Sequence, residues 1–96
     1  MYTKHAQKRI SQRGIQPFVC EMLLAYGEKR FDGHGGLIRY FSERSISRLI
    51  SDKGISYCKK NIKSFRTYLV ESTTDGGIIT AGINHVNHKF KALSAA

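Results

Sequence analysis

The chain has 96 residues, enough for one small folded domain, which we place over residues 1–96, and too few for two. Hydrophobic and charged contents of 41% and 24% are ordinary, but 16 Lys and Arg against seven Asp and Glu give a net charge of +9, which favours polyanionic partners. No apolar run reaches the roughly 18 residues of a membrane span, so we expect neither a membrane partner nor a signal peptide. Two distant cysteines, Cys20 and Cys58, predict no disulfide scaffold and favour a cytoplasmic location.

Two helices are predicted at the start of the chain. Residues 4–13 follow Thr3, which suits an N-cap, and end at Gly14, which suits the left-handed residue after a helix. Residues 17–26 begin with Pro17, a favoured residue in the first helical turn. The short link between the two predicts a helical hairpin, whose second helix is the more apolar.

The rest of the chain is predicted to form two β-hairpins with two short helices between them. These elements are strands 28–32 and 37–42, helices 43–53 and 57–65, and strands 66–72 and 77–83. Glycine-containing turns separate the strands of each hairpin, and β-branched residues are concentrated in the second. The order ααββααββ predicts an α+β domain with an antiparallel four-stranded sheet, and we expect residues 90–96 to be a frayed tail.

The sequence lacks the residue patterns that several familiar kinds of catalytic and metal site require. His85 and His88 stand three apart, but zinc takes three or four ligands and no Cys or carboxylate lies between them, so we expect no metal site and no cofactor. The Gly33–His34–Gly35–Gly36 segment is flanked by two strands, which favours a hairpin turn over a phosphate cradle. No serine lies in a Gly-x-Ser-x-Gly elbow, and no carboxylate pair suggests a glycosidase.

Basic residues are therefore the main candidates for function. They form three groups: Lys4, His5, Lys8, Arg9 and Arg13 on the first helix, then Lys59, Lys60, Lys63 and Arg66, and finally His85, His88, Lys89 and Lys91. Tyr57, Tyr68 and Phe90 interleave with them, a mixture that suits RNA, whose phosphates meet cations while its bases stack on rings. Neighbouring cations keep His5 neutral more readily, which suits a general base, whereas Arg13 before Gly14 favours a structural tie to the turn.

The opening of the chain resembles that of a family of small bacterial domains of unknown function. The residues His5-Ala6-Gln7-Lys8-Arg9-Ile10-Ser11-Gln12-Arg13-Gly14-Ile15 follow its pattern His-Ala-x-x-Arg-hydrophobic-x-x-Arg-Gly-Ile, and Asp75-Gly76-Gly77-Ile78-Ile79-Thr80 is similar to its closing strand. That family distantly resembles the RelE, ParE and BrnT-type toxins, compact α+β proteins. RelE-type members cut mRNA without a metal, and similar small proteins travel in mobile gene cassettes. The resemblance implies that His5, Arg9 and Arg13 belong to the matched motif and that an acidic antitoxin-like protein is a partner.

Three functions remain as hypotheses. The first is a module that binds RNA, another polyanion or an acidic protein through Lys4, Lys8, Arg39, Lys59, Lys60, Lys63 and Lys89. The second is a metal-independent ribonuclease in which His5 or His85 is the base and Arg9, Arg39 or Lys89 clamps the phosphate. The third is a protein that binds a small anion in a pocket. The sequence leaves the substrate open, and also whether the chain forms a homodimer.

Overall fold

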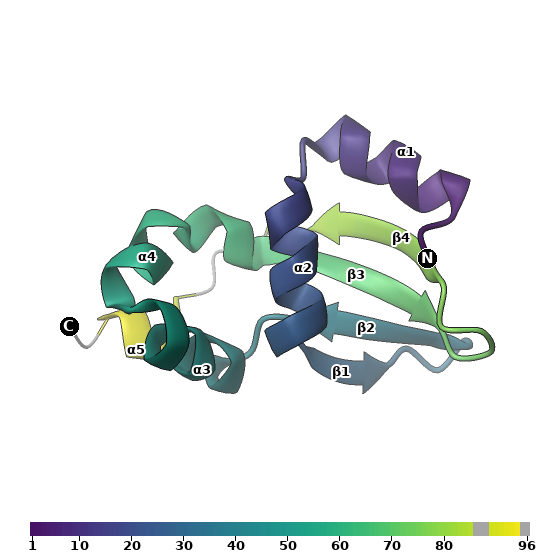
Figure 1. Ribbon diagram of the computed structural model, residues 1–96. Helices are drawn as coiled ribbons and strands as arrows, with labels where there is room; N and C mark the ends of the chain where they lie inside the picture. The colour runs from purple at the N-terminus through teal and green to yellow at the C-terminus, as the bar shows by residue number, and fades with distance from the viewer. Residues whose placement is uncertain (86–88, 95–96) are drawn as a thin grey trace.

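The computed structural model describes residues 1–85 and 89–94, which form one antiparallel sheet with helices on one face and at one end (Figure 1). The elements are α1 (Lys4–Arg13), α2 (Pro17–Tyr26), β1 (Glu28–Phe31), β2 (Gly36–Tyr40), α3 (Glu43–Lys53), α4 (Ile55–Lys60), the 3₁₀-helix η1 (Ile62–Arg66), β3 (Thr67–Ser72), β4 (Ile78–Ile83) and α5 (Lys91–Ser94). The strands lie in the order β1-β2-β3-β4. The predicted α+β class and its element order are confirmed. No helix in residues 1–85 or 89–94 is long and apolar enough to cross a bilayer.

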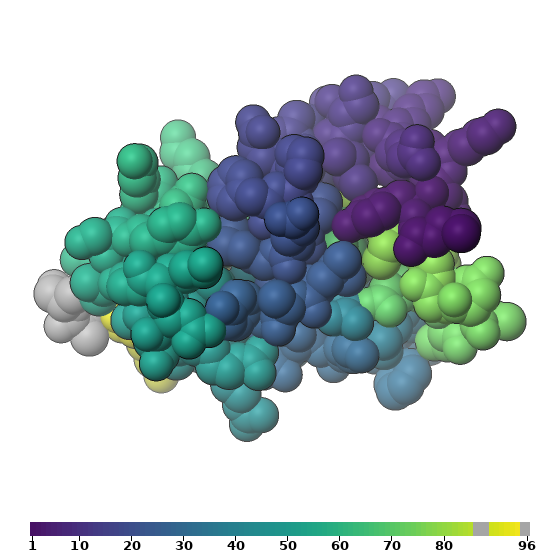
Figure 2. Space-filling model, viewed as in Figure 1, coloured from purple at the N-terminus to yellow at the C-terminus, as the bar shows by residue number. Residues whose placement is uncertain are grey.

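The first two helices begin and end where the sequence predicts. The Thr3 hydroxyl accepts a hydrogen bond from the Ala6 N–H at 3.1 Å, and Gly14 adopts a left-handed φ of 64° that lets its N–H reach the last carbonyls of α1. Both helices lie on the same face of the sheet, α1 along β4 and α2 across β2 and β3 (Figure 1). In the space-filling view the blue residues of α2 lie over the middle of the molecule and the purple residues of α1 over its upper right part (Figure 2).

The apolar core runs from this helix-covered face into the end of the molecule where α3, α4 and α5 gather. Leu23 of α2 packs with Leu69 of β3 in the first part, and both are fully buried. In the second part three buried rings meet. The ring centroids of Phe41 and Phe65 lie 5.0 Å apart, and those of Phe65 and Phe90 lie 6.1 Å apart, with the latter two rings edge to face. These rings fix the end helices against the sheet.

Two expectations about the second half of the sequence need correction. The helix predicted at residues 57–65 is divided, because Asn61 ends α4 and its side-chain amide donates to the Tyr57 carbonyl at 2.8 Å. Ile62, which directly follows this break, is 44% exposed. Residues 90–94, expected to be frayed, instead bury Phe90 and Leu93 and include α5, because these side chains complete the core beside Phe65.

The turn between β1 and β2 is held by Asp32. Its carboxylate accepts hydrogen bonds from the backbone N–H groups of His34 at 2.6 Å and Gly36 at 2.9 Å, and these bonds lower the pKa of Asp32 from its ordinary value of 3.8. A depressed pKa in the folded state means that the stability due to this carboxylate is present above the unfolded pKa and is lost as the pH falls through the folded value.

We therefore expect Asp32→Asn to be less stable than the wild type near neutral pH and to converge with it in acid. Urea unfolding of both proteins from about pH 7 down to about pH 2 measures the difference, provided that both remain two-state. A gap in unfolding free energy that stays constant over this range would contradict the role assigned to the charged carboxylate.

Candidate nucleic-acid interface

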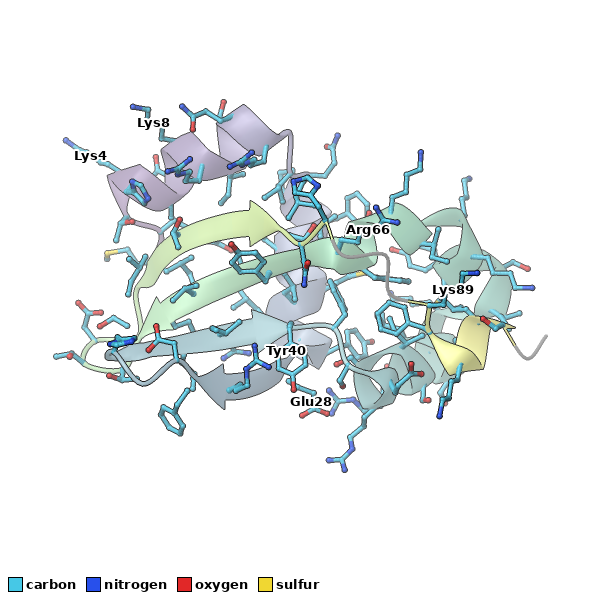
Figure 3. All side chains as sticks on the ribbon, turned by 180° about the vertical axis from the view of Figure 1, so that it is seen from behind. Lys4, Lys8, Glu28, Tyr40, Arg66 and Lys89 are labelled. Carbon is cyan, nitrogen blue, oxygen red and sulfur yellow. The ribbon has the colours of Figure 1, made fainter. Side chains whose placement is uncertain are left out.

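The second face of the sheet carries no helix within the described part of the chain, and it faces the viewer in Figure 3. Along β3 the burial alternates: Thr67, Leu69 and Glu71 are buried under the helices, whereas Tyr68 and Val70 are half-buried on the second face. Alternation along a strand and the antiparallel pairing put Ile38 and Tyr40 of β2 on the same face as Tyr68. This surface is therefore partly apolar and accessible.

A cleft of about 1200 Å³ lies where this face meets the helices at the end of the sheet. Its lining contains five cations, which come from β1, α4, η1 and the segment before α5: Arg30, Lys59, Lys63, Arg66 and Lys89. It also contains five aromatic side chains, Tyr40, Phe41, Phe65, Tyr68 and Phe90. The combination is an aromatic interior with a positively charged rim.

The buried phenylalanines hold the rim cations in place. Lys63 and Arg66 flank Phe65 in η1, and Lys89 directly precedes Phe90, so the edge-to-face contact of these two rings ties separate segments of the chain to one wall of the cleft. Figure 3 shows Arg66 and Lys89 at the same end of the uncovered face. These cations lie far apart in the sequence, and they come together only because residues 89–94 pack back onto the core.

Three rim lysines form no ion pair with the carboxylates of residues 1–85 and 89–94. In the described residues the ion pairs are Arg39–Glu71 and Arg44–Glu28, and neither involves Lys59, Lys63 or Lys89. The single carboxylate of the described lining belongs to Glu43, whose oxygens accept the Lys91 backbone N–H at 3.0 and 3.2 Å. A concave surface lined mainly by one sign of charge concentrates counter-ions, so the cleft should attract anions.

The structure places only some of the predicted binding residues in the cleft. Lys59, Lys63 and Lys89 line the cleft, whereas Lys60 is exposed outside it. Lys4 and Lys8 project from α1 at the opposite end of the molecule from Lys89 (Figure 3).

Arg39 lies on the helix-covered face. Its guanidinium pairs with Glu71 and donates to the Leu24 carbonyl at 3.1 Å. Burial lowers the pKa of this arginine from its usual value.

The predicted catalytic residues do not meet in the cleft. His5 is exposed and Arg9 half-buried on α1, while His85 is exposed just after β4, and none of the three lines the cleft. His88 lies outside the described residues. Arg13 is exposed in the last turn of α1, and Gly14 has the predicted left-handed conformation.

Sequence reasoning missed Arg30 and Gly82, and it left Tyr40 unassigned. Arg30 pairs with Ile38 in the β1–β2 ladder, so its side chain rises beside Tyr40 with the guanidinium 5.4 Å from the ring centroid. Gly82 lies opposite Tyr68 in the β3–β4 ladder. A glycine inside a strand often marks a close approach, and that signal was available in the sequence.

Comparison with known proteins identifies no relative. No family model matches the chain, and neither a curated protein nor a solved structure shows significant similarity to it. Across residues 1–85 and 89–94, no three His, Cys, Asp or Glu side chains gather closely enough to hold a metal ion. The chemistry of the cleft must therefore be inferred from its own side chains.

Proposed function

We propose that this protein is a nucleic-acid-binding module and that the cleft on the uncovered face is its binding site. The observation that carries the proposal is the set of Lys59, Lys63 and Lys89 around an aromatic interior, three lysines that pair with no carboxylate in the described part of the chain. Lysines of this kind supply phosphate contacts, and displacement of counter-ions from the phosphates then drives binding. The resemblance of the first helix to a family that itself distantly resembles the RelE-type toxins supports RNA as the ligand.

The interior of the cleft favours nucleic acid over an acidic protein segment. A carboxylate-rich peptide would use the lysines, but it would leave the half-buried rings of Tyr40 and Tyr68 without a matching group. Nucleotides carry both phosphates and flat bases, so they match both parts of the lining.

Binding is favoured here over RNA cleavage. A general base must come within hydrogen-bond reach of the proton that it removes, and no histidine occurs in the described lining of the cleft. His5 on α1 would need a second, separate phosphate site to act.

The test replaces the three rim lysines together, as Lys59→Gln, Lys63→Gln and Lys89→Gln, and measures binding to a fluorescent RNA over a range of salt concentrations. We expect a loss of affinity of about 100-fold at low salt, since each charged contact contributes on the order of 1 kcal/mol. The slope of log K against log salt should flatten by about 2 to 3, because each phosphate contact contributes about 0.7 to 0.9.

The matched control removes the same charge from elsewhere, as Lys4→Gln, Lys8→Gln and Lys29→Gln. These three lysines are exposed and none lines the cleft. Both variants lose three positive charges from the same +9, so a non-specific effect of net charge would weaken both equally. Equal weakening, or no binding of RNA by the wild type, would overturn the proposal.

A further inference from the structure

Two tyrosines occupy adjacent positions on the uncovered face. The register that pairs Arg39 with Leu69 brings the next residues in line, Tyr40 and Tyr68, to neighbouring places on β2 and β3. Both rings are half-buried and both line the cleft. Neither belongs to the packed group formed by Phe41, Phe65 and Phe90, so their role is not to complete the core.

The Tyr68 side chain lies close against the backbone of β4, because the residue opposite it, Gly82, has no side chain. A Cβ atom on Gly82 would stand 2.5 Å from the Tyr68 hydroxyl oxygen, 2.7 Å from Cζ and 2.9 Å from Cε1. The side chain therefore extends across the strand where any other residue would project. The hydroxyl end of the Tyr68 ring therefore lies against β4, and the side chain lines the cleft.

Tyr40 is placed differently. The Arg30 guanidinium lies 5.4 Å from its ring centroid, a cation–π contact that holds the ring and brings another positive charge to the interior. Tyr40 with its Arg30 contact thus lies beside Tyr68, and Lys63 and Lys89 line the same cleft.

We infer that the ligand is single-stranded nucleic acid, with an unpaired base stacked on Tyr68 and the neighbouring phosphates against the rim lysines. This inference rests on the proposed function. In a duplex the bases are paired and stacked on one another, so only the phosphates are available and the tyrosines contribute nothing. An unpaired base offers a flat face whatever its identity, which predicts weak dependence on sequence.

The experiment compares a fluorescent single-stranded uridine-rich RNA with the same strand annealed to its complement, by anisotropy, for the wild type, Tyr68→Leu and Tyr68→Phe. We expect the wild type to prefer the single strand. Tyr68→Leu should lose about five- to 100-fold in affinity for it, the usual range for one stacked base, and should bind the duplex unchanged. Tyr68→Phe keeps the ring and should bind both probes as the wild type does.

The outcomes separate this inference from the proposed function. Equal binding of both probes by the wild type, with both weakened by the triple lysine substitution, would overturn single-strand stacking and leave the proposed function standing. Binding of neither probe would overturn both. The wild-type comparison needs no variant, so it decides the point even where Tyr68→Leu fails to fold.

Discussion

Replacing Glu71 by glutamine should lower the free energy of unfolding by about 3 kcal/mol, because it leaves the Arg39 charge buried without its partner. The side chains of Arg39 and Glu71 are only 14% and 12% exposed, and they meet beneath α2, where Arg39 also donates to the Leu24 carbonyl. The pair thus links two central strands to the end of a helix. Chemical denaturation at neutral pH measures the loss, with the circular dichroism of the folded baseline as the check on structure.

The surface pair provides the control for this prediction. The Arg44 Nε atom lies 3.8 Å from the Glu28 Oε1 atom, and the Arg44 side chain is 78% exposed. Arg44→Gln should therefore change the free energy of unfolding by less than about 0.5 kcal/mol. The double substitution Arg39→Met with Glu71→Leu removes both buried charges and should recover much of the loss. If Glu71→Gln costs no more than Arg44→Gln, the buried pair is not a stabilising link.

The sequence predicts the local features of this fold well. Thr3, Gly14 and Pro17 act through contacts within a few residues, so α1 and α2 begin and end where propensity and capping place them. Both hairpins follow from turn residues and β-branched runs for the same reason.

Predictions that depend on the packing of distant segments were incomplete. Strand alternation shows that Arg39 and Tyr40 face opposite ways, but it does not show which face α2 covers. That choice buries Arg39 with Glu71 and leaves Tyr40 in the cleft. Lys89 lines the cleft only because Phe90 packs against Phe65, a contact between residues 25 positions apart.

Replacing Gly82 by valine should destabilise the protein by about 2 kcal/mol, because the new side chain occupies the space now taken by the Tyr68 ring. In a Tyr68→Ala background the same substitution should become neutral or stabilising by up to about 1 kcal/mol, since valine favours strands and can fill the vacated surface. Unfolding of the four proteins gives a double-mutant cycle, and we expect a coupling energy of about 2 kcal/mol or more.

The difference between the effect of Gly82→Val on stability in the wild type and in the Tyr68→Ala background distinguishes a specific contact from a general intolerance of side chains at Gly82. A backbone that required glycine would be harmed equally in both backgrounds, but Gly82 is not among the glycines with positive φ. Because valine displaces the ring without removing it, Gly82→Val should also weaken single-stranded RNA binding to a degree similar to Tyr68→Leu and leave the rim lysines untouched. Additive stability effects, or a folded Gly82→Val protein with wild-type affinity for the single strand, would show that Tyr68 does not depend on Gly82 for its position.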